Sequence, residues 1–298
     1  MTNSTDTSFL AVDGGGTGCR LALVRDGVRT DHTGGPANVF SDFSGAVGAI
    51  RDGLAGLAAR AGTTVAALLP VPAHLGLAGV TEDRDAEKVR AALPLTNATV
   101  GSDRQTALRG AFGAGDGTLA ALGTGSFVAR QKAGEHRIVG GWGARLGDEA
   151  SGYWISRRAL SATLAAQDGL APATGLTRAL LARFSGQTGR LIEFASRAAP
   201  GEVAAFAPTV ADAAAAGDET ARAIMTDAAA YVVTTMTAIG WRPGEPVCLT
   251  GGASESVAAY LPANVIADRV APLGTPLDGA LDLARGNGRR PDPAQARG

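Results

Sequence analysis

In the first hundred residues, apolar side chains recur at every second position in some segments and at every third or fourth position in others. This pattern predicts strands followed by helices. Short strands are expected at residues 9–13, 19–25 and 28–33, where an apolar run, an alternating segment and an Arg-Asp-Gly turn succeed one another. Helices and strands then alternate, and Ser41 is the expected N-cap of the first helix. The predicted order is β-β-β-α-β-α-β-α.

A second set of strands begins after residue 116 and repeats the opening of this order. A helix-rich segment at residues 149–239 follows it, and then a buried strand and two further helices. We expect two related α/β domains, residues 1–115 and 116–286, each with a mixed sheet flanked by helices, and a cleft between them. The Pro-, Gly- and Arg-rich residues 287–298 are expected to be disordered.

The composition argues against nucleic-acid and membrane functions. The 298-residue chain has a formal net charge of −1 and therefore no basic field for nucleic acid or an anionic membrane. No apolar run reaches the roughly 20 residues of a membrane span, and the first residues lack a basic secretory signal. Cys19 and Cys248 are expected to be buried thiols, and His32, His74 and His136 form no spaced pair for a metal site. We expect a soluble cytoplasmic protein.

The first two strands are joined by the glycine-rich turn at residues 14–18. A P-loop requires a Lys before Ser or Thr, and a dinucleotide fingerprint requires a third glycine followed by a helix, so neither motif is present. The N–H groups of Gly15 and Gly16 and the hydroxyl of Thr17 suit an anion nest. Asp13, at the strand end, is a candidate Mg²⁺ ligand through water.

A second turn of this kind offers Gly123, Thr124, Gly125 and Ser126 as further phosphate-binding residues. Either turn alone is as well explained as a tight hairpin. Two such turns, each after an apolar strand, favour a triphosphate held by two domains.

Gly251 and Gly252 form a third glycine site, between a buried strand and a helix. Ligands bind at the carboxyl ends of strands in α/β sheets, and glycine lets an adenine or a ribose approach the backbone closely. A simple strand-to-helix turn remains the alternative for this pair.

Three polar segments have two interpretations each on the residues alone. Asp103 ends a strand just before a helix, where a carboxylate either caps the helix or accepts a proton from an attacking hydroxyl. Asn38, after Gly-Pro-Ala, is either a turn residue or a partner of sugar hydroxyls. Residues 140–156 combine glycines, aromatic side chains and two adjacent carboxylates. The segment is either a loop that connects two elements or one wall of a binding site.

Taken together, these motifs resemble the BadF/BadG/BcrA/BcrD-type ATPases of the sugar kinase/Hsp70/actin superfamily, and more narrowly their N-acetylglucosamine and glucosamine kinases. The resemblance implies two actin-like ATPase (ribonuclease H-like) domains and ATP- and Mg²⁺-dependent phosphorylation of the 6-hydroxyl of an amino sugar. It leaves open which amino sugar is used and the oligomeric state, although homodimers are common among such kinases. The segments that carry it are residues 13–20, 34–38, 101–113, 123–127, 140–156 and 249–254.

The resemblance also assigns roles to individual residues. Asp103 falls on the family's catalytic aspartate, the two glycine turns fall on its ATP-phosphate sites, and Gly251 with Gly252 falls on its adenosine site. The positions that fall on its sugar contacts are Asn38, Asp103, Thr124, Gly141, Trp142, Asp148 and Gly152.

Ala150 departs from the family, which often has glycine at this position. Alanine is strained at positive φ but favourable in a first helical turn, and we expect a helix from Glu149 onward that includes Tyr153 and Trp154. Glu149 is the second choice after Asp148 for a ligand contact, and Trp241 is expected to be a packing residue.

Two rival functions share this fold. The first is an ATPase activator of a dehydratase or reductase, which would need bridging cysteines for an iron-sulfur cluster. Cys19 and Cys248 have no spacing of that kind. The second is a non-catalytic sugar sensor, against which the intact Asp13, Asp103 and phosphate turns argue.

Overall fold

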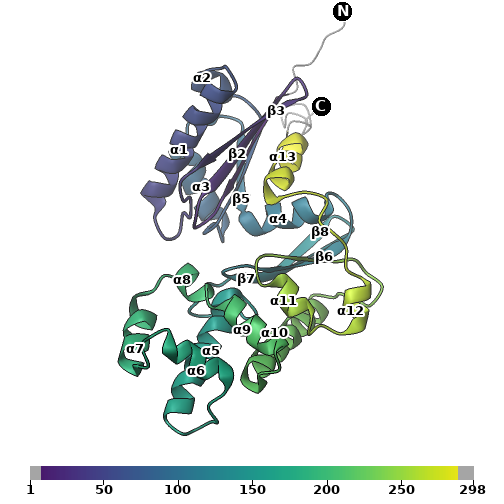
Figure 1. The fold of residues 1–298 in the computed structure, drawn as a ribbon. Helices are drawn as coiled ribbons and strands as arrows, with labels where there is room; N and C mark the ends of the chain where they lie inside the picture. Colours follow the sequence, from purple (N-terminus) through teal and green to yellow (C-terminus); the bar gives the residue numbers. More distant parts are fainter. Residues whose placement is uncertain (1–7, 288–298) are drawn as a thin grey trace, which may run out of the picture. The chain divides into compact units, whose positions relative to one another are not determined.

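The computed structural model describes residues 8–287 of the chain. The chain divides into two compact units, one made of Met1–Ala114 with Pro272–Gly298 and the other of Gly115–Ala271. Each unit contains one sheet flanked by helices, which confirms the expected α/β class (Figure 1).

The first unit is built on a five-stranded sheet in the order β3-β2-β1-β4-β5. β1, β2 and β3 pair antiparallel, whereas β4 and β5 run parallel to β1 and are reached through helices. This confirms the predicted order of elements. The strand bounds are β1 Phe9–Gly14, β2 Cys19–Arg25, β3 Val28–Gly34, β4 Ala73–Leu77 and β5 Ala98–Ser102.

Helices cover both faces of this sheet (Figure 1). One face packs apolar side chains of α1, α2 and α3 against the strands, and α13 covers the other face over Ala11 and Ala22. Removal of these apolar surfaces from water holds the layers together. The helix bounds are α1 Phe43–Arg60, α2 Val65–Leu68, α3 Asp83–Ala92, α4 Asp103–Phe112 and α13 Pro276–Asn287.

The C-terminal helix α13 belongs to the first unit, although the expected second domain, residues 116–286, includes it. α13 crosses α4 closely, because a Cβ placed on Gly279 would lie 2.5 Å from the backbone nitrogen of Gly110. The guanidinium of Arg109 contacts Asp282 at 2.5 Å beside this crossing. Asn287, from the expected disordered tail, ends α13, and residues 288–298 lie outside the described residues.

The second unit has a four-stranded sheet in the order β8-β7-β6-β9. β9 pairs parallel to β6, and the other pairs are antiparallel. The strand bounds are β6 Gly117–Leu122, β7 Ser126–Lys132, β8 Glu135–Gly140 and β9 Val247–Thr250. Helices α5 to α12 share one large apolar core with this sheet. Their bounds are α5 Gly152–Gln167, α6 Gly175–Ala182, α7 Thr188–Arg197, α8 Pro200–Ala204, α9 Ala207–Ala215, α10 Glu219–Ala238, α11 Ser254–Ala258 and α12 Ala263–Ala267.

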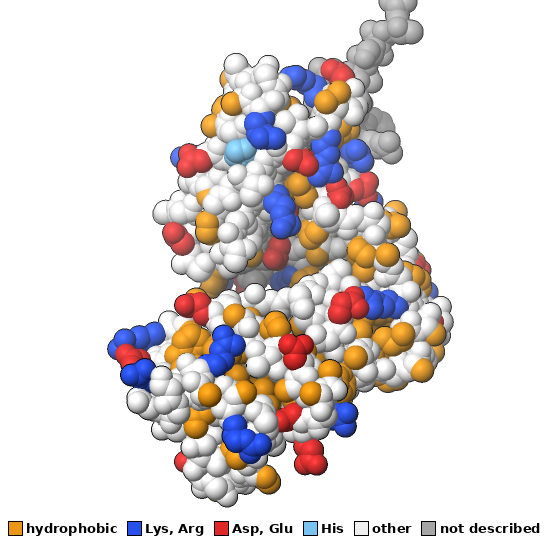
Figure 2. Space-filling view, in the orientation of Figure 1, with side chains coloured by type: hydrophobic (Ala, Val, Ile, Leu, Met, Phe, Trp, Pro, Cys, Tyr) orange, Lys and Arg blue, Asp and Glu red, His pale blue; other side chains and the backbone are white. Residues whose placement is uncertain are grey.

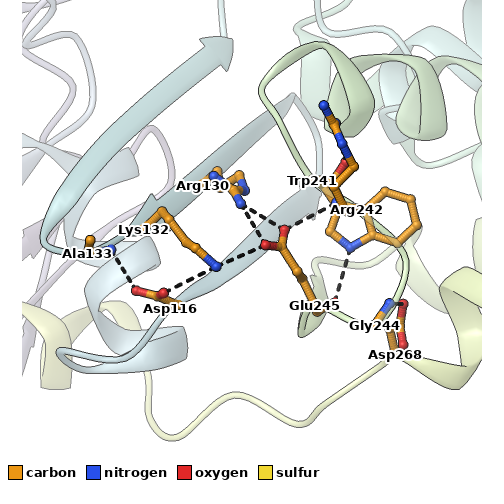
Figure 3. A network of polar contacts seen from close by, with 9 residues as sticks. All are labelled: Asp116, Arg130, Lys132, Ala133, Trp241, Arg242, Gly244, Glu245 and Asp268. Atoms are coloured by element: carbon orange, nitrogen blue, oxygen red, sulfur yellow. Dashed lines mark hydrogen bonds and ion pairs between the residues drawn. The ribbon is translucent and has the colours of Figure 1, made fainter.

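A network of charged groups fixes the loop before β9 to β7 (Figure 3). The carboxylate of Glu245 accepts from Arg130 at 2.7 and 2.9 Å and from Lys132 at 3.0 Å. These cations lower the pKa of Glu245 to about 2. The buried indole of Trp241 donates to the Glu245 carbonyl oxygen at 3.1 Å, which confirms Trp241 as a packing residue.

Positive and negative side chains are interspersed on the face drawn in Figure 2, without a broad patch of one sign. None of the helices within residues 8–287 has the length and apolar character of a bilayer span.

Candidate functional site

The glycine turn between β1 and β2 is fixed at its base and open at its tip. Gly15 donates to the Gly18 carbonyl oxygen at 2.9 Å, and Ala37 donates to the Gly15 carbonyl oxygen at 2.9 Å. A Cβ placed on Gly14 would lie 2.6 Å from the Leu77 side chain, whereas a Cβ on Gly16 would meet no atom within 4 Å. Gly16 and Thr17 are exposed. The turn therefore presents the tip of the expected anion nest to a ligand.

Two carboxylates of the first unit influence each other near this turn. Burial raises the pKa of Asp13 to about 6, Arg20 at 3.7 Å opposes this effect, and the charge of Asp103 adds to it. Burial likewise raises the pKa of Asp103. Shifts of this kind, in partly buried carboxylates beside a ligand-binding loop, are typical of functional sites.

Asp103 is the first residue of α4 and not its N-cap. The Oγ of Ser102 caps the helix by accepting from the backbone N–H of Arg104 at 3.2 Å. The alternative interpretation of Asp103 as the cap is therefore wrong, because the preceding serine has that role. The Asp103 carboxylate accepts from the Ser102 hydroxyl at 3.3 Å.

The side chain of Asn38 organises the turn before α1. Its Oδ1 accepts from the backbone N–H groups of Phe40 at 3.0 Å and Ser41 at 3.2 Å. The N-cap of α1 is Asp42, which accepts from Gly45 at 2.9 Å, so the expected cap at Ser41 is wrong by one residue. The turn role of Asn38 is thus present, and its NH₂ group remains a donor that a sugar hydroxyl suits.

A hollow of about 480 Å³ lies between α1 and the segment that carries Asn38. Gly16 and Asn38 line one part of it, and Asp42 and Asp52 add carboxylates along α1. The first unit therefore has a concave surface at its proposed phosphate and sugar residues.

In the second unit, the turn between β6 and β7 is tied to the start of α5. Gly123 donates to the Gly125 carbonyl oxygen at 2.9 Å. Gly152 donates to the Gly123 carbonyl oxygen at 2.8 Å, and Tyr153 donates to the Thr124 carbonyl oxygen at 3.2 Å. The Ser126 hydroxyl donates to the Glu149 carbonyl oxygen at 2.5 Å. The structure thus brings together two motifs that the sequence places some 25 residues apart.

Asp148 joins the same two segments through its side chain. It is 7% exposed, and its Oδ1 accepts from the backbone N–H of Gly143 at 3.3 Å. A Cβ placed on Gly125 would lie only 2.6 Å from Oδ2 of Asp148. Burial raises the pKa of Asp148, and the backbone N–H groups of Ser126 and Gly143 oppose this effect.

Ala150 has a φ of +66°, so the expectation that it lies in a helical first turn is wrong. Asp148 also has a positive φ, of +61°. α5 begins at Gly152, with Ser151 as the N-cap that accepts from Trp154 at 3.1 Å. Ala150 is fully buried, and its methyl group packs in the core at the cost of left-handed backbone strain. The helix start is displaced because the loop must first turn Asp148 toward Gly125.

The remaining residues of this segment fall into two groups. Trp142 is 66% exposed, and it lies beside Gly147, whose added Cβ would be 3.3 Å from the Trp142 Cβ. Gly141 precedes it at a φ of +73°. Tyr153 and Trp154 are half-buried in α5, the helix expected to contain them, and pack against the core. An exposed indole on a glycine-rich loop can cover the apolar face of a sugar ring.

Tyr231 is a residue of the site region that sequence reasoning missed. Burial raises the pKa of this α10 tyrosine, and the charge of the nearby Glu149 adds to this effect. Glu149 therefore lies close to Tyr231 of α10. The sequence gives no signal for this pair, because 82 positions separate its members.

Gly251 and Gly252 have different environments. Gly251 has a φ of +94°, and its added Cβ would lie 2.5 Å from the Leu122 carbonyl oxygen. Ala253 donates to that oxygen at 2.9 Å, so this turn packs directly on the end of β6. Gly252 would meet no atom within 4 Å. Packing accounts for Gly251, and Gly252 is the one open to a ligand.

Asp13, at the end of β1, would offer a magnesium ion one carboxylate beside the first glycine turn. Within residues 8–287, no group of three or more His, Cys, Asp or Glu side chains forms a metal cluster. A single carboxylate such as that of Asp13 is sufficient for Mg²⁺, because this ion keeps several waters and binds through one or two carboxylates together with substrate phosphates.

Comparison with known proteins decides the family. Residues 10–272 match the BadF/BadG/BcrA/BcrD ATPase family. The chain belongs to this family. The matched residues include the three glycine sites, Asp13, Asp103 and the segment at residues 140–156.

Two relatives are similar over nearly their whole length. A glucosamine kinase of Vibrio cholerae is 27% identical over 93% of this chain and 95% of its own. A Chromobacterium violaceum protein proposed to be an N-acetylglucosamine kinase is 33% identical, with a TM-score of 0.85 over 94% of this chain and 99% of its own. A ROK family glucokinase of Streptomyces griseus, 19% identical with a TM-score of 0.56 over 94% and 99% of the two chains, shares the fold. The expected actin-like kinase fold is thereby confirmed.

Proposed function

We propose that this chain is an ATP-dependent amino-sugar kinase that phosphorylates the 6-hydroxyl of glucosamine or N-acetylglucosamine. The observation that carries the proposal is the pair Asp13 and Asp103, two partly buried carboxylates with raised pKa values in the unit that holds the first glycine turn. The relatives described above, a glucosamine kinase and a proposed N-acetylglucosamine kinase, support the choice of substrate.

Asp103 is the residue proposed to act on the sugar hydroxyl. Its carboxylate would take the hydroxyl proton while the oxygen forms its bond to the γ-phosphorus, and the bond from that phosphorus to the bridging oxygen breaks as ADP leaves. The raised pKa of Asp103 makes the carboxylate a better base than a fully solvated one.

The two glycine turns are proposed to bind the phosphates of ATP. Gly16 and Thr17 would donate to one phosphate group, and Thr124 and Gly125 to another, since backbone N–H groups in such turns attract anions. Gly15, Gly123 and Ser126 hold the two turns in shape through their own hydrogen bonds. Asp13 would hold the magnesium ion through water. When bound, that ion neutralises charge on the phosphates. Gly252 offers the open approach that an adenosine requires.

Sugar recognition is proposed for the polar residues around Asn38 and Asp148, together with Trp142. The Asn38 NH₂ group can donate to a hydroxyl, and the buried Asp148 carboxylate can accept from one. Asp148 is also held by Gly143, so a sugar would meet a carboxylate whose position is already fixed. Thr124, Gly141 and Gly152 lie in the same segments, and their backbone groups are proposed to contact the sugar.

The activator function has no support in the positions of the cysteines. Cys19 lies fully buried in β2 of the first unit and Cys248 fully buried in β9 of the second, each with its pKa raised by burial. A cluster-bridging cysteine has to be an accessible thiolate. The sensor function predicts sugar binding without turnover, which an assay distinguishes.

The test is a coupled ADP-release assay with glucosamine, N-acetylglucosamine, glucose and N-acetylmuramic acid, followed by phosphorus NMR of the product. We expect turnover with at least one of the first two sugars and a phosphate on the 6-oxygen. Sugar binding without turnover on any of the four would favour the sensor and contradict the proposal.

A further inference from the structure

The sheet face beneath α4 carries a buried histidine to which the proposed chemistry assigns no role. His74, in β4, is 6% exposed, and its Nε2 has no hydrogen-bond partner among the described residues. A buried polar atom without a partner destabilises the folded state. Its presence beside the strand end that leads to Asp103 therefore calls for a physical reason.

The tautomer of His74 follows from its neighbour Thr99. The two residues are paired between β4 and β5, with the His74 Nδ1 2.8 Å from the Thr99 Oγ1. The same hydroxyl donates its only proton to the Ala73 carbonyl oxygen at 3.4 Å. With the Thr99 proton on the Ala73 carbonyl oxygen, Nδ1 carries a proton and donates it, and Nε2 keeps a bare lone pair. Burial lowers the pKa of His74 to about 4, so the ring is neutral near pH 7.

A donor for Nε2 is available on the first turn of α4. The point at which a Cβ of Gly101 would stand lies 3.6 Å from the His74 Nε2 and 2.9 Å from the Gln105 Oε1. The absence of a side chain at Gly101 thus lets the Gln105 carboxamide lie over the sheet beside the imidazole. The oxygen and nitrogen ends of a carboxamide exchange by a half-turn, and a side-chain rotation that turns the NH₂ toward the ring would supply the missing donor.

We propose that His74 is a positioning residue: its Nε2 accepts a hydrogen bond from the Gln105 carboxamide and so fixes the first turn of α4, which carries Asp103. The inference rests on the proposed role of Asp103. A second contact fixes the same turn, since a Cβ placed on Gly76 would lie 2.5 Å from the Thr106 hydroxyl oxygen. The Thr106 hydroxyl also donates to the Asp103 carbonyl oxygen at 2.8 Å.

The kinetic test uses four variants: His74→Leu, Gln105→Leu, the double variant and His74→Gln. Leucine removes the acceptor or the donor, whereas a glutamine oxygen at position 74 comes close to the place of Nε2. We expect each leucine variant to lower kcat about 10- to 100-fold with KM for sugar and ATP within about twofold of wild type, because a misplaced catalytic group loses rate without losing binding. The double variant should be no slower than the slower single one, and His74→Gln should recover most of kcat.

A nitrogen NMR experiment adds a readout that a purely structural role would not move. The His74 Nε2 signal should show an unprotonated, hydrogen-bonded nitrogen, and it should shift in Gln105→Leu. Unchanged kcat in both leucine variants, multiplied losses in the double variant, or an unshifted Nε2 signal in Gln105→Leu would each overturn the inference. Should His74→Leu fail to fold, Gln105→Leu still decides the matter.

Asp103→Asn, measured in parallel, separates this inference from the proposed function. Normal turnover of Asp103→Asn contradicts the proposed function. Loss of turnover in Asp103→Asn with wild-type kcat in Gln105→Leu contradicts the positioning role alone.

Discussion

The carboxylate of Asp148 occupies the space that a side chain at position 125 would need. A Cβ on Gly125 would lie 2.6 Å from Oδ2 of Asp148 and 3.1 Å from its Cγ. A side chain at position 125 would therefore displace the Asp148 carboxylate or separate the second glycine turn from the loop at residues 140–148. One glycine both shapes a turn that suits phosphate and admits the carboxylate proposed to bind the sugar.

Gly125→Ala should lower kcat/KM for the sugar about 100-fold, because the new methyl group displaces Asp148 or opens the turn by about 1 Å. Steady-state kinetics measures the loss, and circular dichroism checks the fold. Gly189→Ala is the matched control, since a Cβ at Gly189 in α7 meets no atom within 4 Å. Equal activity of the two variants would show that the contact has no functional consequence.

The left-handed backbone of residue 150 makes a second, quantitative prediction. Ala150→Val should destabilise the protein by at least about 3 kcal/mol, because a β-branched side chain is strained at positive φ and the fully buried site leaves no room for it. Ala150→Gly should change stability by less than about 1 kcal/mol, since relief of strain offsets the lost methyl group and the added chain entropy. Urea unfolding measures both effects.

Ala133→Val isolates the backbone contribution. Ala133 has a φ of +51° but is exposed, so only strain acts there, and a cost of about 1 kcal/mol is expected. A cost at Ala133 as large as that at Ala150 would mean that burial at position 150 contributes nothing.

Much of the first unit could be predicted from the sequence, whereas the start of α5 could not. The strands β1, β2 and β3 follow from alternation and a turn signal, both of which are local. Ala150 was expected in a helix because alanine favours helices, but the packing of Asp148 on Gly125 imposes a positive φ and delays the helix to Gly152. Local propensity yields to tertiary contact at this point.

Contacts between residues far apart in the chain could likewise not be predicted from the sequence. Tyr231 and Glu149 lie on different elements, and α13 returns to α4 through Gly110 and Gly279, glycines that carry no chemical signal of their own. The structure places Asp148 against Gly125 of the second glycine turn, and the charge of Asp103 acts on Asp13 beside the first. The roles that the family resemblance gives to Asp103 and Asp148 stay predictions.

The network around Glu245 predicts an acid-dependent loss of stability. Its cationic partners lower the folded-state pKa from the ordinary 4.5 to about 2. A depressed carboxyl pKa contributes stability that is present above the unfolded value and is lost as the pH falls through the folded one. Glu245→Gln should therefore lower the urea midpoint at pH 7, and the gap to wild type should close between about pH 4.5 and pH 2.

Glu193→Gln is the control for this experiment, because the ion pair of Glu193 with Arg197 lies on the exposed surface of α7 and such pairs contribute little. A gap between Glu245→Gln and wild type that stays constant down to pH 2 would contradict the ionic origin of the stabilisation.

The raised pKa of Asp13 predicts an acid limb in the pH–rate profile. The proposed role of Asp13 in holding a magnesium ion requires the ionised carboxylate, so kcat/KM for ATP should fall about tenfold per pH unit below about pH 6. Arg20 lowers the pKa of Asp13, so Arg20→Gln should move this limb to higher pH. Arg25→Gln, on the same strand but bonded to the Ala61 carbonyl oxygen, should leave it in place. An identical limb in wild type and Arg20→Gln would remove Asp13 as its source.

The most direct test of the central claim is single-turnover phosphoryl transfer by Asp103→Asn, with sugar and ATP affinities measured on the same preparation. The variant keeps the shape of the side chain and the Ser102 cap of α4, but it cannot take up the hydroxyl proton. We expect both dissociation constants within about threefold of wild type and a rate lowered at least about 100-fold. A transfer rate close to that of wild type would show that Asp103 is not the catalytic residue.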